Sequence, residues 1–157
     1  MKVELTKIRK AEESDLKAIN AIARQVHDLH VELRPDIYVS TDEVIPAELF
    51  REILRNGLFF VGEVDEVIIS YAVCVIRIWD NPVQTKQKIM FVDALGNDRK
   101  YQHCGIGTQM MDYIIDYAKK EGCSRLELQV TSANQVALEF YQKLNMRIKA
   151  QIMELEL

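Results

Sequence analysis

The stretch from residue 58 to residue 78 constrains the fold more than any other part of the sequence. It holds two runs rich in Val, Ile, Phe and Tyr, residues 58–64 and 67–78, which only Asp65 and Glu66 separate. Apolar runs of this length with so short a break favour two antiparallel strands joined by a tight turn. No glycine stands at the turn, so the sequence leaves its two-residue geometry open. The chain therefore needs a sheet that other elements cover.

Helical and strand patterns alternate on both sides of this hairpin, and Trp79 to Pro82 predicts a break after it. In chain order we expect a strand at 3–9, helices at 15–30 and 46–56 around a loop with a short extended piece at 37–39, and strands at 58–64, 67–78 and 88–95. After these we expect a helix at 105–120, a strand at 124–130, a helix opened by a capping box of Ser132 and Gln135, and an alternating strand at 147–157. This order predicts a mixed α/β layer protein with a single domain over residues 1–157.

Composition narrows the class of protein further. The chain has 157 residues, 48% of them hydrophobic, and is long enough to fold without disulfides or metal. Its 20 Lys and Arg against 24 Asp and Glu leave a net charge of −4, which argues against a nucleic-acid binder. No apolar stretch suits a membrane span or a signal peptide. The odd set Cys74, Cys104 and Cys123, without CxxC spacing, favours a reduced, cytoplasmic setting.

The most informative stretch for function is a predicted strand, a polar loop, Gly105-Ile106-Gly107 and a helix. Glycines at such a junction let a ligand approach the backbone, and the free N–H groups of a helix start attract phosphate. A Walker loop is absent, and the dinucleotide fingerprint lacks its third glycine because position 110 is Met. What remains is a QxxGxG string at residues 102–107, which by itself is equally compatible with a helix-start turn that binds nothing.

A second motif changes that balance. Residues 134–141 read NQVALEFY, an NxxAxxFY pattern that begins 27 positions after Gly107, beyond a strand and at the start of the next helix. In this order and on these elements, the two motifs resemble the GNAT family of N-acetyltransferases. The resemblance covers nearly the whole chain and implies the acyl-CoA N-acyltransferase (GNAT) fold, a mixed central sheet flanked by helices. It further implies acetyl-CoA as the donor and a primary amine as the acceptor.

The resemblance also assigns residues to the donor site. The QxxGxG loop would hold the pyrophosphate with backbone N–H groups, the strand before it would pair with the pantetheine arm, and Asn134 would face the pantetheine or phosphate side. The residues implied in donor binding are Leu95, Gly96, Asn97, Gln102, His103, Cys104, Gly105, Ile106, Gly107, Thr108 and Asn134.

Two residues suit the chemistry that the resemblance implies. An alkylamine with a pKa of about 10.4 must lose a proton before it attacks a thioester, and a carboxylate or a water held by one accepts that proton. Asp93, beside the donor strand, is the first choice for this role. The leaving thiolate needs a proton or a hydrogen bond, which the phenol of Tyr141 supplies. A paired or solvated Asp93 and a core Tyr141 are the structural alternatives.

The residues that would contact the amine acceptor are the ones that the sequence defines least. We place His30, Tyr38 and Trp79 among them, because the family binds acceptors against the early helices and the loop before the donor strand. No metal is expected, since His103 is isolated from other ligands. The alternating last strand is a candidate edge for a homodimer. Two other functions stay open, namely a non-catalytic acetyl-CoA sensor on the same fold and a Rossmann-type nucleotide-binding domain.

Overall fold

The predicted hairpin lies at the middle of one mixed sheet. The computed structural model describes all 157 residues, and its strands are β1 (Lys7–Lys10), β2 (Leu58–Val64), β3 (Val67–Asn81), β4 (Gln84–Asn97) and β5 (Arg125–Leu128). They form a five-stranded sheet in the order β1-β2-β3-β4-β5. The pairs β1–β2, β2–β3 and β3–β4 are antiparallel, and β5 runs parallel to β4. This order confirms the mixed α/β prediction and excludes the doubly wound parallel sheet of a Rossmann domain.

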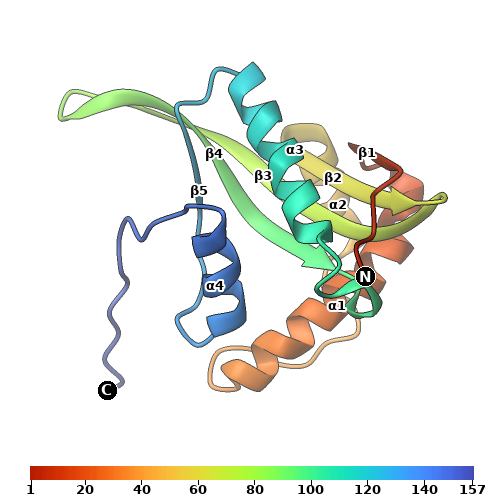
Figure 1. Cartoon of the computed structure of the whole chain (residues 1–157). Coiled ribbons are helices and arrows are strands. Elements are labelled where there is room, and N and C mark those ends of the chain that lie inside the picture. The colour runs from red at the N-terminus through yellow and green to blue at the C-terminus, as the bar shows by residue number, and fades with distance from the viewer.

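Four α-helices pack against this sheet, and helices lie on both of its faces (Figure 1). They are α1 (Leu16–Leu33), α2 (Ala47–Asn56), α3 (Ile106–Lys120) and α4 (Gln135–Lys143), with 3₁₀ turns at Glu13–Asp15 and Arg99–Tyr101. Figure 1 shows α3 crossing the front of the sheet, α2 behind it, and α4 beside β5. None of the helices combines the length and the apolar character that crossing a membrane needs.

Alternation along the strands divides the apolar side chains between two cores. Phe59, Val61 and Tyr71 point toward α1 and α2, where they join Ile19 and Phe50. The neighbouring residues point the other way, so that Phe60, Ala72 and Met90 meet Met110 and Ile114 of α3. Since successive side chains of a strand face opposite sides of a sheet, the fully apolar hairpin requires helices on both faces.

The β2–β3 turn settles the geometry that the sequence left open. Asp65 and Glu66 adopt φ values of 50° and 68°, both in the left-handed region. A two-residue turn with positive φ at both positions has the twist that antiparallel strands need, although glycine or asparagine is the usual choice. The hairpin forms despite its turn residues because its strands are buried on both faces.

The break predicted at residues 79–82 is wrong. β3 continues to Asn81 and β4 begins at Gln84, and Asn81 pairs with Gln84 across the turn. The two strands therefore project beyond the rest of the sheet as a long ribbon, seen at the upper left of Figure 1. Pro82 is compatible with this ribbon because it stands in the turn, where no ladder hydrogen bond is required.

Other parts of the chain also differ from the sequence prediction. The first strand covers only Lys7–Lys10, and residues 37–39 form no strand. The capping box of Ser132 and Gln135 is absent, because α4 begins two residues later, with Asn134 as its N-cap. Residues 147–157 belong to no strand of the sheet, although their side chains alternate as predicted.

Gly96 allows α1 to lie close to β4. A β-carbon at this position would stand 2.5 Å from Cε1 of Tyr71 and 3.0 Å from Cγ2 of Val26. We expect Gly96→Ala to lower the free energy of unfolding by about 1–3 kcal/mol in urea denaturation, since a rigid ring must move. Gly62→Ala is the control, because there the nearest atoms are the flexible side-chain ends of Met110 and Leu5. An equal loss in both variants would contradict this explanation.

Candidate functional site

The sheet opens where β4 loses its pairing with β5. The register runs from Ile89 opposite Arg125 to Val92 opposite Leu128 and then stops, while β4 continues beside β3 to Asn97. The change coincides with an irregularity, because Val73 pairs with Ala94 and Cys74 with Val92, which leaves Asp93 as an extra residue. Bulges of this kind turn a strand and redirect a side chain. From Asp93 to Asn97, one edge of β4 therefore has no partner strand.

A row of free backbone donors lies at the end of the loop that follows β4. The N–H groups of five residues donate no hydrogen bond within the chain: His103, Gly105, Ile106, Gly107 and Thr108. The N–H groups at a helix start carry partial positive charge and bind phosphate. The loop that the QxxGxG string predicted thus has the donor groups of an anion site, on a chain whose net charge is −4.

The backbone conformation of the loop leaves these N–H groups accessible to a ligand. Gly105, the N-cap of α3, has φ 84°, and His103 has φ 59°. A β-carbon on Gly105 would meet only Lys2, at 4.0 Å, so the space around it is open. The side chain of Gln109 anchors the loop, because its Nε2 donates to the carbonyl oxygens of Val3, at 2.7 Å, and of Gly105, at 3.3 Å.

Gly107 brings three elements together. A β-carbon there would stand 3.1 Å from Cζ of Phe140 on α4 and 3.2 Å from Nδ2 of Asn97 on β4. Glycine at this position therefore permits the start of α3 to touch both the open edge of β4 and the helix that carries Tyr141. The motif residues, far apart in the sequence, meet at this point.

Two asparagines that the sequence assigned to donor binding have structural contacts. Oδ1 of Asn97 accepts a hydrogen bond from the hydroxyl of buried Ser70, at 2.7 Å. Oδ1 of Asn134 accepts one from the backbone N–H of Ala137, at 3.1 Å, and so caps α4. The amide NH₂ groups of these two side chains donate no hydrogen bond within the chain and are left for a ligand.

Tyr141 and Asp93 lie in contrasting surroundings. Tyr141 packs in the core on the α3 side of the sheet, with its ring centroid 5.1 Å from that of Phe140. Burial raises the pKa of the Tyr141 phenol above its usual value, so the group keeps its proton at neutral pH. Asp93 is exposed on the bulge. Burial, with a smaller contribution from the Asp93 charge, raises the pKa of the Cys74 thiol to about 12.

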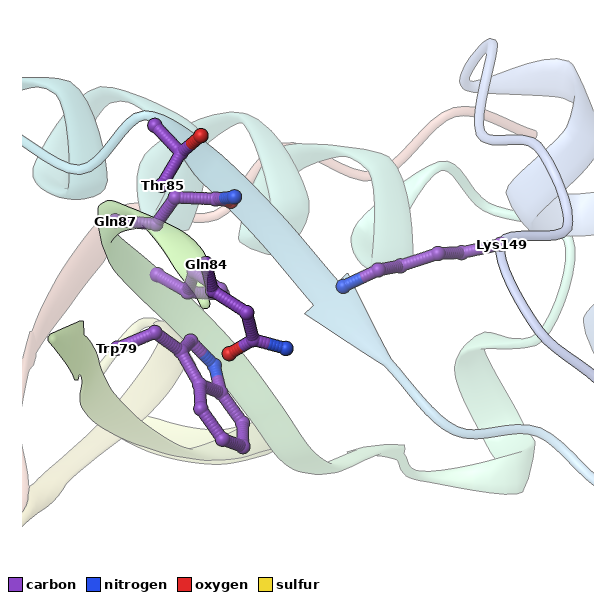
Figure 2. Close-up of a pocket in the computed structure, with 6 residues that line it drawn as sticks. Trp79, Gln84, Thr85, Gln87 and Lys149 are labelled. Atoms are coloured by element: carbon purple, nitrogen blue, oxygen red, sulfur yellow. The ribbon is translucent and has the colours of Figure 1, made fainter. Parts of the chain in front are cut away.

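The structure brings together two of the three residues that the sequence placed on the acceptor side. The rings of His30, on α1, and Tyr38, on the loop after it, have centroids 5.2 Å apart. Trp79 lies elsewhere, on the projecting ribbon, where it lines a cavity with Gln84 and Lys149 (Figure 2).

His27, one turn before His30 on α1, holds this loop in place through a contact of 2.7 Å between its Nε2 and the carbonyl oxygen of Val39. The chain has no group of three or more His, Cys, Asp or Glu side chains arranged to hold a metal ion.

Comparison with known proteins agrees with this geometry. Residues 23–146 match the acetyltransferase (GNAT) family. The chain belongs to this family. The BH1408 protein of Bacillus halodurans, in the crystal structure of its tetramutant, is 30% identical, with a TM-score of 0.92 over 97% of this chain and 100% of that one. GNAT membership and fold, which the two motifs implied, are thereby confirmed.

Other similar proteins are named as N-acetyltransferases. Aminoglycoside N-acetyltransferase AAC(6')-Iy, crystallised in complex with CoA, has a TM-score of 0.72 over 96% of this chain and 93% of its own, at 16% identity. An uncharacterised N-acetyltransferase of Methanocaldococcus jannaschii is 32% identical over 58% of this chain, and N-alpha-acetyltransferase 50 of Danio rerio is 33% identical over 40%. These matches cover only 39% and 38% of those two relatives.

The surroundings of the His30 side chain predict that the stability of the protein depends on pH. Burial, together with the charge of nearby His27, lowers the pKa of His30 below the usual histidine value. The unfolded chain therefore binds a proton near pH 6.5 that the folded chain does not, so this contribution to stability is lost as the pH falls through that range. We expect the free energy of unfolding to fall more steeply from pH 7.5 to pH 5.5 in the wild type than in His30→Gln. Identical slopes in urea titrations would contradict this.

Proposed function

We propose that the chain is an N-acetyltransferase that moves the acetyl group of acetyl-CoA directly to a primary amine. The observation that carries the proposal is the meeting of five free N–H groups at the start of α3 with the unpartnered edge of β4. The first feature suits a pyrophosphate and the second suits a chain of amide groups such as pantetheine. Membership of the GNAT family and the CoA complex of AAC(6')-Iy support the same assignment.

In this proposal the donor-binding residues divide by the groups they offer. Leu95, Gly96 and Asn97 offer backbone groups to the pantetheine arm, and one of their N–H groups polarises the thioester carbonyl. Residues 102–108 receive the pyrophosphate, largely through backbone N–H groups, which explains how an acidic chain binds an anion. Asn134 contributes its free amide NH₂, since its oxygen caps α4.

Asp93 is the proposed proton acceptor. Its carboxylate stands at the bulge where the two strands separate and is exposed to solvent. It takes the proton of the incoming ammonium group directly or through a water, and the neutral amine nitrogen then forms its bond to the acetyl carbon. The acetyl carbon–sulfur bond breaks in the same sequence and leaves CoA as a thiolate.

Tyr141 is the proposed proton donor to that thiolate. Its phenol belongs to the buried side of the sheet, on the helix that Gly107 brings against the donor loop through Phe140. A pKa raised by burial favours the protonated phenol, which is the form that can donate. In the proposed mechanism Asp93 thus accepts a proton from the attacking amine, and Tyr141 donates one to the leaving thiolate.

The acceptor is proposed only as a class. His30 and Tyr38 at the end of α1 are the candidate acceptor contacts, whereas Trp79 lines a separate cavity on the ribbon. The net charge of −4 attracts a cationic amine, whether a small molecule or a peptide. A cytoplasmic location and a single domain over residues 1–157 complete the proposal. The cysteines are consistent with a reduced setting, because Cys74, Cys104 and Cys123 are all free thiols.

The proposal predicts both binding and turnover. We expect acetyl-CoA, but not NAD, to raise the melting temperature in a thermal-shift assay, because only the former fits the loop and the open strand edge together. We further expect CoA thiol release with at least one member of a panel of polyamines, aminoglycosides and peptides. Stabilisation by acetyl-CoA without thiol release from any amine would instead favour the sensor function, and no stabilisation would contradict both.

Two variants separate the roles of the catalytic residues. Tyr141→Phe should lower kcat about 100-fold with little change in the KM for acetyl-CoA, because it removes a proton donor from the leaving group. Asp93→Asn should lower kcat/KM for the amine most at neutral pH and recover activity at high pH, where the amine is already neutral. Steady-state kinetics from pH 6 to pH 10 measure both effects.

Tyr117→Phe is the matched control for the tyrosine variant. Tyr117 lies near the C-terminal end of α3 and packs on Phe60, with ring centroids 5.1 Å apart. It should keep wild-type kinetics. Full turnover in Tyr141→Phe would remove Tyr141 from the mechanism, and an unchanged pH profile in Asp93→Asn would remove Asp93.

A further inference from the structure

Arg77 on β3 has a guanidinium that is held in place but unpaired. Its Cζ lies 3.5 Å from the ring centroid of Phe91, on the neighbouring strand β4. Stacking of this kind holds the guanidinium flat on the aromatic face and leaves the N–H groups at its edge free to donate. Arg77 is exposed and forms no salt bridge within the chain. The structure therefore positions a group that binds carboxylates, and the chain provides no carboxylate for it.

Arg77 and Asp93 lie on the same face of the sheet. Val73 packs against α1 and α2, so the alternation of β3 places Arg77 on that face as well. Val92 packs on the α3 side, so Phe91 and Asp93, its two neighbours on β4, point the other way and share the face of Arg77. Two residues of extended strand place Asp93 about 7 Å from Phe91. The exposed carboxylate of Asp93 and the guanidinium of Arg77 thus stand on one open surface.

Arg77 and Asp93 are the only charged residues that β3 and β4 supply to this part of the surface. In residues 73–79 of β3 and 87–94 of β4, every other side chain on this face is uncharged. Asp93, like Arg77, forms no salt bridge within the chain. One positive and one negative group are therefore left near each other on the same face, each without a partner.

The neighbouring strand β5 leaves this arrangement of charge unchanged. Its one acidic residue, Glu127, is already bound by Lys149. Its one basic residue, Arg125, forms no salt bridge and lies two residues further from Asp93 than Glu127 does. The surface is thus positive on the side of Arg77 and negative at Asp93.

A ligand with both charges would fit this surface better than a plain cation. In the proposed mechanism the ammonium group of the acceptor gives its proton to Asp93, and an acceptor with positive charge alone would be repelled by Arg77. A carboxylate on the acceptor would instead receive two parallel N–H···O bonds from the guanidinium. Because like charges placed together exclude the wrong partner, Arg77 would discriminate against polyamines and aminoglycosides.

We infer that the acceptor is a small amine that carries its own carboxylate, of the class of free amino acids, and that Arg77 binds this carboxylate. The inference rests on the proposed acetyltransferase function and names the substrate class of the same site. Because about 7 Å separates Asp93 from the ring under Arg77, the two charges of the acceptor lie a few bonds apart. The amine nitrogen bonds to the acetyl carbon as before, Asp93 takes the ammonium proton, and the carboxylate is unchanged by the reaction.

Matched pairs of an acid and its amide test the inference. The probes are a set of L-α-amino acids, β-alanine and γ-aminobutyrate, each with its amide, which keeps the amine and removes the negative charge. We expect kcat/KM to be at least about tenfold higher for the best acid than for its amide, because only the acid pairs with Arg77. Arg77→Met keeps an apolar chain over Phe91 but has no N–H donors, so it should lower kcat/KM for the acid to that of the amide.

Binding gives a second measure that does not depend on turnover. In titration calorimetry with CoA present, the best acid should have a Kd at least about tenfold lower than its amide, and Arg77→Met should remove the difference. Arg55→Met is the control and should keep the wild-type preference, because Arg55 is another exposed arginine without a salt bridge, in the last turn of α2. An unchanged thermal shift by acetyl-CoA shows that Arg77→Met is folded and binds the donor.

The outcomes separate a failure of this inference from a failure of the proposed function. Equal use of every acid and its amide, faster use of a polyamine than of any acid, or a preference that persists in Arg77→Met overturns the inference and leaves the acetyltransferase function in place. If no amine releases CoA thiol, polyamines and aminoglycosides included, the proposed function itself is contradicted, and the inference falls with it.

Discussion

The early end of the β4–β5 pairing is the constraint on which the candidate site depends. Four residues of β5 pair with Ile89 to Val92, and the bulge at Asp93 then turns β4 away while β3 still holds it as far as Asn97. A strand edge left open inside a layered protein is costly unless something pairs with it. The same bulge exposes Asp93, so one irregularity creates both the proposed donor-binding edge and the position of the proposed base.

The start of α3 converts that open edge into a site for an anion. Positive φ angles at His103 and Gly105 turn the loop so that its N–H groups point away from the chain, and Gly107 lets the helix approach β4 and α4 closely. Ile106, Met110 and Ile114 are buried on the sheet, which holds the helix start in place. Core packing on one side of α3 therefore fixes the donor groups on its end, as an ordered anion site requires.

The sequence predicted correctly those features that depend on residues close together in the chain. The hairpin, the four helices and the two motifs follow from side-chain periodicity and from glycine positions, and the structure contains them close to their expected places. The predictions failed where distant contacts decide. The ribbon runs past Trp79 because β3 and β4 continue to pair with each other. The start of α4 is a local exception, because Asn134 and not Ser132 is its N-cap and accepts a hydrogen bond from the backbone N–H of Ala137. Residues 147–157 alternate like a strand, but none of their backbone groups forms a backbone hydrogen bond.

The sequence by itself determined the layered α/β class, the GNAT motifs and the family that they indicate, because each depends on periodicity or on residues near one another in the chain. Only the tertiary structure decided that Gly107 meets Asn97 and Phe140, that His30 lies on Tyr38 while Trp79 lies in another cavity, and that the β5 edge stays open. These relations depend on how separate elements of the fold pack against one another. Their distances follow from how the sheet twists, where it bulges and which side chains fill the two cores, and no short stretch of sequence records that.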